Sequence, residues 1–290
     1  MRAALERIAL RGALSLLRRL GPERASNAMG ALARWIGPYL PASRVADGNL
    51  RRAMPELDAH ARRRIVRGVW DNLGRVVGEL PHLGSLIETA AGPGWELADP
   101  AGVRAMAQHG GPLLFMTAHM GNWEVLPRVM TAYAMKAAVI YRPIGDPVMD
   151  AFVRDLRLAA APGFALFPKG AKGARQALGF LQARGMLGIL ADQKMNDGIE
   201  ARLFGLPAMT VSAPAILALR FGCPVVMARV DRIGPARFRI VTEPPLTIEE
   251  TGVRQTDVLA LTQQVNDGFE RWIRAQPEAW LWLHRRWPKI

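Results

Sequence analysis

The chain has 290 residues, and half of them are hydrophobic, which is enough to bury a large core. Its one cysteine, Cys223, excludes an internal disulfide and is most simply a small core residue. Because Cys and His do not cluster with metal-ligand spacing, a structural metal site is not expected. The net charge of +13 favours an anionic partner, which leaves nucleic acid, anionic lipid or an acidic protein.

The positive charge is concentrated near the N-terminus, where residues 1–75 contain fifteen Arg and six acidic residues. Residues 3–20 have the pattern of a basic amphipathic helix whose charges are too dense for a membrane span. A cleaved signal peptide is not indicated. The helix either lies in a membrane interface or packs on the protein, and the pattern leaves both open. A second predicted helix, residues 23–37, is followed by Tyr39 and contains Trp35, two side chains that suit an interface.

A cluster of Gly and Pro at residues 92–94 marks a boundary in the pattern. Before it, residues 42–80 are helical and rich in Arg, so residues 1–92 are predicted to form a helical region that associates with a membrane. After it, strands and helices alternate, and residues 93–290 are predicted to form an α/β domain with a largely parallel sheet flanked by helices. The expected strands are residues 113–117, 137–141, 187–191 and 224–230, and the expected helices lie near 122–133, 147–160, 171–183 and 211–221.

The strand at 113–117 is followed by His119 and, five residues later, by Glu124. In open α/β sheets, the carboxyl ends of strands are where ligands usually bind. A neutral imidazole can accept a proton from a hydroxyl, and a carboxylate on its other nitrogen fixes the tautomer. We therefore predict that His119 is a general base and that Glu124 orients it. A chance His–Glu pair is the alternative, and the position after a strand argues against it.

Asp146 and Pro147 have the pattern of a helix start, with Asp as the N-cap and Pro at the first position. Asp150, Arg154 and Arg157 then fall on one face of that helix. These charges either form a surface ion pair of small value or direct an arginine into a cleft, where it stabilises an oxyanion or binds phosphate.

Two further stretches contain polar residues at predicted element ends. Asp192 follows the strand at 187–191, so in a parallel sheet it lies at the same edge as His119, although an Asp there is often only a turn cap. Residues 204–210 are predicted to form a loop before a helix. Its Gly205 and Thr210 make it a candidate anion site, because helix N-termini bind anions.

Four of the eight Trp residues lie in the last nineteen residues, between basic residues. They are Trp272, Trp280, Trp282 and Trp287. This combination is typical of nucleic-acid stacking or of a membrane-interface belt, and a segment that packs its Trp residues inward has the same composition.

Five stretches in this order resemble one protein family. They are His119-Met-Gly-Asn-Trp-Glu124; Tyr141-Arg142-Pro143 with Asp146-Pro147, Asp150 and Arg157; Gly188-Ile-Leu-Ala-Asp192-Gln193; Phe204-Gly205-Leu-Pro-Ala-Met-Thr210; and Pro277-Glu-Ala-Trp-Leu-Trp-Leu-His-Arg-Arg-Trp287. The chain is similar over nearly its whole length to the bacterial lipid A biosynthesis acyltransferases of the late, lauroyl/myristoyl type, which are part of the lysophospholipid acyltransferase superfamily.

The resemblance implies a glycerolipid-acyltransferase-like α/β fold at the cytoplasmic face of the inner membrane. It implies transfer of a fatty acyl group from acyl carrier protein to a hydroxyl of an anionic lipid A precursor, without a cofactor. By matching motif positions, His119 is the base, Glu124 its partner, Arg157 an essential arginine and Asp192 a further motif residue. The candidate substrate-binding residues are Arg142, Arg154, Gly205 and Thr210.

Alternative functions remain open at this point. A lysophospholipid or an aminolipid is an alternative acyl acceptor, because the motifs do not identify the pocket walls that select the acceptor. Coenzyme A is an alternative acyl donor. A non-enzymatic, basic protein of the membrane surface would explain the charge and the Trp residues. It would leave His119, Glu124 and Asp192 unexplained. Nucleic acid is not expected as a partner.

Overall fold

The computed structural model describes residues 12–248 and 250–288. Residues 12–20 are helical. The helices that follow are α2 (Pro22–Ile36), α3 (Pro41–Ala53), α4 (Ala59–Glu79), α5 (Pro100–His109), α6 (Leu126–Ala132), α7 (Pro147–Ala160), α8 (Ala171–Gln182), α9 (Ala213–Phe221) and α10 (Arg254–Ala275). Short 3-10 helices are η1 (Gly37–Tyr39), η2 (Leu80–Ser85), η3 (Trp123–Val125) and η4 (Pro277–Ala279). None of the helices described is long and apolar enough to cross a membrane.

The described residues form one seven-stranded sheet with the order β1-β9-β8-β2-β5-β3-β4. Its strands are β1 (Gly94–Leu97), β2 (Leu113–Thr117), β3 (Ala137–Tyr141), β4 (Ala165–Pro168), β5 (Met186–Leu190), β8 (Val225–Gly234) and β9 (Arg237–Thr242). The five strands from β8 to β4 are parallel, and β9 and β1 continue the sheet in the opposite direction. A separate hairpin joins β6 (Ile199–Leu203) and β7 (Leu206–Thr210).

Helices cover both faces of the sheet, and the central strands are buried on both sides. Along β2, Leu113 and Phe115 pack in a core with α5 and α6, whereas Leu114 and Met116 pack in a second core with α9 and α10. This division follows from the period-2 alternation of side chains along a strand. It also explains why β2 reads in the sequence as a continuous apolar run.

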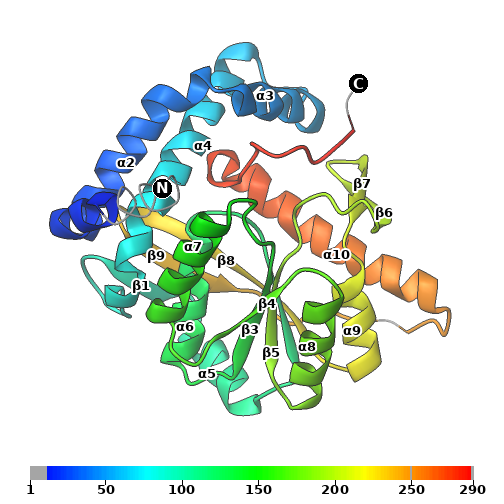
Figure 1. The fold of residues 1–290 in the computed structure, drawn as a ribbon. Helices are drawn as coiled ribbons and strands as arrows, with labels where there is room; N and C mark the ends of the chain where they lie inside the picture. The colour runs from blue at the N-terminus through cyan, green and yellow to red at the C-terminus, as the bar shows by residue number, and fades with distance from the viewer. Residues whose placement is uncertain (1–11, 249, 289–290) are drawn as a thin grey trace.

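The N-terminal helices and the C-terminal segment meet on one side of the molecule, at the top of Figure 1. Helices α2 and α4 pack so closely at Gly74 that a Cβ on this residue would lie only 2.3 Å from the carbonyl oxygen of Met29. On α3, Asn49 donates hydrogen bonds of 2.9 Å and 2.7 Å to the carbonyl oxygens of Trp282 and His284. The C-terminal segment, red in Figure 1, is thereby held against α3.

The α/β class with a mostly parallel sheet is confirmed. The predicted strands at 113–117 and 137–141 and the helix at 147–160 have the observed bounds, and Asp146 caps α7 by accepting hydrogen bonds of 2.9 Å from Val148 N and Met149 N. The prediction of one loop at 204–210 is wrong, because β7 occupies its last five residues. The predicted helix at 3–20 lies partly outside the described residues.

Candidate active site

The β2 and β5 strands are neighbours, and Thr117 lies opposite Leu190 in their register. His119 and Asp192 each follow two residues later, so both side chains leave the carboxyl edge of the sheet together. The His119 Nδ1 atom lies 2.8 Å from Asp192 Oδ1, and the His119 backbone N–H donates to Asp192 Oδ2 at 3.1 Å. This contact fixes the imidazole and leaves its Nε2 atom for a substrate.

The C-terminal segment completes the environment of Asp192. The Trp280 indole N–H donates a 2.7 Å hydrogen bond to Asp192 Oδ2. Two backbone hydrogen bonds, Leu281 N to His119 O and Gly121 N to Ala279 O, bind this segment to the turn after β2. That turn needs glycine, because Gly121 has a φ of 55° and a Cβ there would lie 1.9 Å from the carbonyl oxygen of Val230.

Asp192 is fully buried, yet its surroundings favour the carboxylate. Burial acts to raise the pKa of Asp192, but the charge and hydrogen bond of His119 outweigh it. The pKa of Asp192 is therefore held well below its ordinary value of 3.8. A buried carboxylate of this kind stabilises the imidazolium that forms when His119 takes up a proton.

Glu124 has a different partner from the one that the sequence predicts. Arg157 on α7 binds it with two hydrogen bonds, Nε to Oε2 at 2.7 Å and Nη2 to Oε1 at 2.5 Å. Trp123 adds an indole hydrogen bond of 3.1 Å to Oε1. The prediction that Glu124 holds the imidazole is thus wrong in this structure, because both of its oxygens face Arg157 and Asp192 occupies His119 Nδ1.

Arg157 remains positively charged in this pairing. Burial acts to lower the pKa of its guanidinium, but the hydrogen bonds and charge of Glu124 raise that pKa above its ordinary value. Glu124 uses the Nε and Nη2 atoms, which leaves Nη1 for a ligand in the cavity that Arg157 lines.

A buried polar network holds the turn between His119 and Glu124 from behind. Asn122 accepts a hydrogen bond from Glu124 N at 3.1 Å and donates one of 2.7 Å to Glu79 Oε2. Glu79, at the end of α4, is fully buried and forms an ion pair with Arg232 on β8. The α4 helix and β8 thereby position the segment that carries Glu124.

His119, Glu124 and Arg157 line a cavity of about 790 Å³. The cavity lies along the carboxyl edge of the sheet, where Ala174 of α8 and Ala213 of α9 line it, and it extends between the sheet and helices α5, α6 and α7. Its walls are mainly apolar and include Val103, Met106, Phe115, Val129, Met130 and Phe164. An apolar cavity of this size with a few polar groups at one end is the usual form of a ligand pocket.

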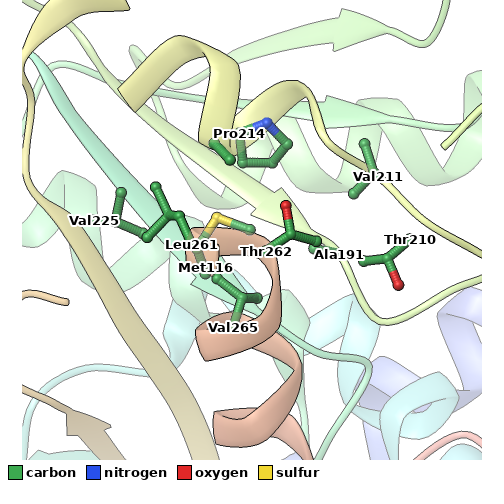
Figure 2. Close-up of a pocket in the computed structure, with 10 residues that line it drawn as sticks. Met116, Ala191, Thr210, Val211, Pro214, Val225, Leu261, Thr262 and Val265 are labelled. Atoms are coloured by element: carbon green, nitrogen blue, oxygen red, sulfur yellow. The ribbon is translucent and has the colours of Figure 1, made fainter. Parts of the chain in front are cut away.

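Thr210 lies on the other side of the sheet, by a second cavity of only about 10 Å³. Figure 2 shows Thr210 there with apolar neighbours such as Val211 and Val265. The Thr210 hydroxyl oxygen accepts a 2.7 Å hydrogen bond from the buried Arg286 guanidinium. A space this small holds at most about one water molecule. Thr210 therefore holds the C-terminal segment in place.

The structure places the other three candidate substrate-binding residues in different parts of the molecule. Arg142 follows β3 and lines the large cavity with His119. Arg154 pairs with Asp155 at 3.8 Å on the exposed side of α7 and is not among the cavity residues. Gly205 occupies the turn between β6 and β7, also away from the cavity. Of these four residues, the structure therefore places only Arg142 in the cavity that His119 lines.

The four C-terminal Trp residues are buried, as in the interpretation of an inward-packed segment. Trp280 is the hydrogen-bond partner of Asp192 that sequence reasoning missed, although it lies within a quoted motif. Its neighbour His284 packs edge-on against the Trp280 ring, with centroids 5.4 Å apart. Both ring nitrogens of His284 are buried without a hydrogen-bond partner among the described residues. Burial lowers the pKa of His284 to about 4, so this ring is neutral near pH 7.

The family model for bacterial lipid A biosynthesis acyltransferases matches residues 5–289, nearly the whole chain, and includes every residue of the site above. A search of the curated proteins finds no match. Because the match spans the sheet, the His119–Asp192 pair and the C-terminal segment together, the chain belongs to the bacterial lipid A biosynthesis acyltransferases, a family of acyl-transferring enzymes.

Proposed function

We propose that the enzyme transfers a fatty acyl group from the thioester of acyl carrier protein to a hydroxyl of a lipid A precursor. The observation that carries this proposal is the hydrogen-bonded His119–Asp192 pair at the polar end of a large apolar cavity. A proton acceptor and an apolar chain site are the two things that direct acyl transfer to a hydroxyl needs.

In the proposed reaction, Asp192 holds the proton on Nδ1 of His119, so Nε2 has the free lone pair. Nε2 takes the proton from the acceptor hydroxyl as its oxygen attacks the thioester carbonyl. The tetrahedral intermediate then breaks its C–S bond, and the leaving thiolate receives the proton from the imidazolium. The ester forms without a covalent enzyme intermediate, in keeping with a motif that has no Ser or Cys.

The developing oxyanion needs a hydrogen-bond donor near His119, and Arg157 is the candidate. Its guanidinium is charged, lines the same cavity, and is fixed by the two hydrogen bonds to Glu124. A prepositioned donor of this kind typically contributes about 3–4 kcal/mol to transition-state stabilisation. Glu124 thus acts on the reaction through Arg157, a role that differs from the one predicted.

The apolar part of the cavity is the proposed site of the acyl chain. It is continuous with the His119 end and is lined by flexible Met side chains as well as by Phe115 and Phe164. Met adapts to irregular apolar ligands. A chain bound there places its thioester carbon at the polar end, beside His119.

We also propose that the enzyme works at the cytoplasmic face of the inner membrane. At the end of α2, in η1 and directly after it, large apolar side chains are exposed at helical spacing. They are Leu32, Trp35, Ile36, Tyr39 and Leu40. Trp35 and Tyr39 are 73% and 84% exposed. Aromatic residues of this kind favour the bilayer interface, and the basic surplus of residues 1–75 favours anionic lipid.

The test is acyl transfer in detergent micelles with labelled acyl carrier protein and a tetra-acylated lipid A precursor. Label that moves to the lipid supports donor and acceptor together. Thioester hydrolysis that depends on His119, without transfer, would contradict the lipid A acceptor and favour a lysophospholipid or an aminolipid. The absence of both reactions in a folded enzyme would contradict the proposal.

A further inference from the structure

The mouth of the catalytic cavity carries an excess of positive charge that the proposed reaction does not use. Four guanidinium or ammonium groups line the cavity, from Arg142, Arg157, Lys169 and Lys194, against the two carboxylates of Glu124 and Asp197. Arg157 and Glu124 neutralise each other through their two hydrogen bonds. Three cations and one exposed carboxylate remain.

The three cations come from the carboxyl ends of three adjacent strands. Arg142 directly follows β3, Lys169 directly follows β4, and Lys194 lies in the loop after β5. The sheet order places β5 beside β2, then β3, then β4. The fold therefore gathers residues that are far apart in the sequence along one edge of the cavity. Lys194 follows the strand next to that of His119, Arg142 follows the next strand, and Lys169 follows the farthest of the three.

Each of the three side chains is exposed, and none has an acidic partner within 4.0 Å among the described residues. The four Arg residues of β8 and β9 do have such a partner, for example Arg237 and Arg239 with Glu96. Unpaired cations beside a substrate cavity form a ready site for an anion, and Arg and Lys are the residues that bind phosphate.

The spacing indicates that the anion is separate from the reacting atoms. Neighbouring strands lie roughly 4.8 Å apart, so β3 is roughly 10 Å and β4 roughly 14 Å from β2, which carries His119. A group bound between Arg142 and Lys169 would not contact the imidazole. It would act as an anchor that orients the substrate while His119 acts on a distant oxygen.

We propose that Arg142, Lys169 and Lys194 form a phosphate-binding site at the mouth of the catalytic cavity. The site rests on the proposed function, because its ligand is a phosphate group of one of the two substrates. That phosphate is either on the lipid acceptor or on the arm that joins the acyl thioester to its carrier. Both sources present the same chemistry to the three cations.

The first measurement is binding of inorganic pyrophosphate to the full chain, which does not require turnover. The three rim variants are Arg142→Gln, Lys169→Gln and Lys194→Gln, each of which removes one cation from the rim of the cavity. The matched control is Lys136→Gln, since Lys136 is an exposed cation just before β3, at the opposite edge of the sheet. Each rim variant is expected to bind roughly tenfold more weakly than wild type, and the control to bind as wild type does. Equal affinity in all five proteins would overturn the proposal.

The second measurement assigns the phosphate to a substrate. Transfer is compared for acyl carrier protein against a phosphate-free acyl thioester, and for a phosphorylated against a dephosphorylated glycolipid acceptor. The quantity measured for each pair is kcat/KM. If a rim variant lowers kcat/KM roughly tenfold more for the phosphorylated member than for the phosphate-free member, the phosphate site binds that substrate. If neither ratio changes in any rim variant, the site is no substrate anchor and the proposal fails.

The two proposals fail in different ways. Absence of any His119-dependent transfer or hydrolysis in wild type would contradict the proposed function and would leave pyrophosphate binding to be measured as before. Transfer that proceeds normally while the rim variants match Lys136→Gln would contradict the phosphate site alone.

Discussion

At the scale of single residues, the proposed mechanism depends on which carboxylate contacts which basic side chain. His119 lies next to Asp192 and Glu124 next to Arg157, and each contact is at hydrogen-bond distance. The sequence predicted all four residues as site members and placed Asp192 at the His119 edge of the sheet. It did not predict the pairing, because an apolar run identifies a strand without its neighbours, and the adjacency of β2 and β5 decides which carboxylate reaches the imidazole.

Asp192→Asn tests this pairing. The variant loses the charge that orients the ring and stabilises the imidazolium, so turnover is expected to fall by about 10²–10⁴-fold while the fold persists. Asp155→Asn, at an exposed position of α7, is the matched control and should retain wild-type turnover. Steady-state transfer rates measure both, and undiminished turnover of Asp192→Asn would remove Asp192 from the mechanism.

His284 gives a prediction about pH. The ordinary pKa of a histidine is 6.5, and burial lowers the pKa of His284 to about 4 in the folded protein. Between these values the unfolded chain binds a proton that the folded protein does not, so stability falls as the pH is lowered. The loss is on the order of 3 kcal/mol between pH 7 and pH 4.

Urea unfolding of wild type and His284→Asn at several pH values checks this. The variant should lose less stability on acidification, whereas a control, His60→Asn at an exposed position of α4, should follow wild type. Parallel curves for wild type and His284→Asn would show that His284 is not the titrating group.

At the scale of elements, the sequence predicts the buried strands best and the outer ones worst. Strands β2, β3 and β5 are continuous apolar runs because both faces are covered. In β9, Arg237-Phe-Arg-Ile240 alternates polar and apolar residues, a readable strand pattern that the prediction did not use. The sequence predicts a loop at 204–210, where the structure has β7 and the turn before it, because Gly205 and Pro207 interrupt the strand pattern.

Glu79, at the end of α4, holds the turn between His119 and Glu124 through its hydrogen bond with Asn122. Glu79→Gln removes the buried charge opposite Arg232 and is expected to lower the free energy of unfolding by about 3–5 kcal/mol. Replacing both partners, as Glu79→Leu with Arg232→Met, should cost less than the sum of the two single changes, because no unpaired charge remains buried. Arg51→Gln breaks an exposed pair with Asp47 and should cost under about 1 kcal/mol.

Denaturant unfolding of these variants, including the single changes Glu79→Leu and Arg232→Met, provides these values. If Glu79→Gln were as mild as Arg51→Gln, the network around Asn122 would have no role in holding the Glu124 segment.

At the scale of the whole molecule, charge and exposed apolar residues point to one surface. The α2–η1 face presents Trp35 and Tyr39 to solvent, and we predict that it contacts anionic membrane. The double change Trp35→Ser, Tyr39→Ser should lower partition into anionic vesicles by about tenfold or more. Leu259→Ser, on the exposed side of α10, is the control that should bind as wild type does.

Vesicle co-sedimentation measures this partition. Equal binding of the double variant and wild type would place the membrane contact elsewhere, with residues 1–20 the next candidate. Deleting residues 1–20 should then move the protein to the soluble fraction.

In the proposed mechanism His119, held by Asp192, is the base of acyl transfer. The transfer rate of His119→Ala beside wild type, with a thermal unfolding scan of each, checks this role. The transfer rate of the variant is expected to fall by about 10²–10⁴-fold while the cooperative thermal transition is retained. Transfer at the wild-type rate, or loss of the thermal transition with loss of activity, would contradict this role and make His119 a structural residue.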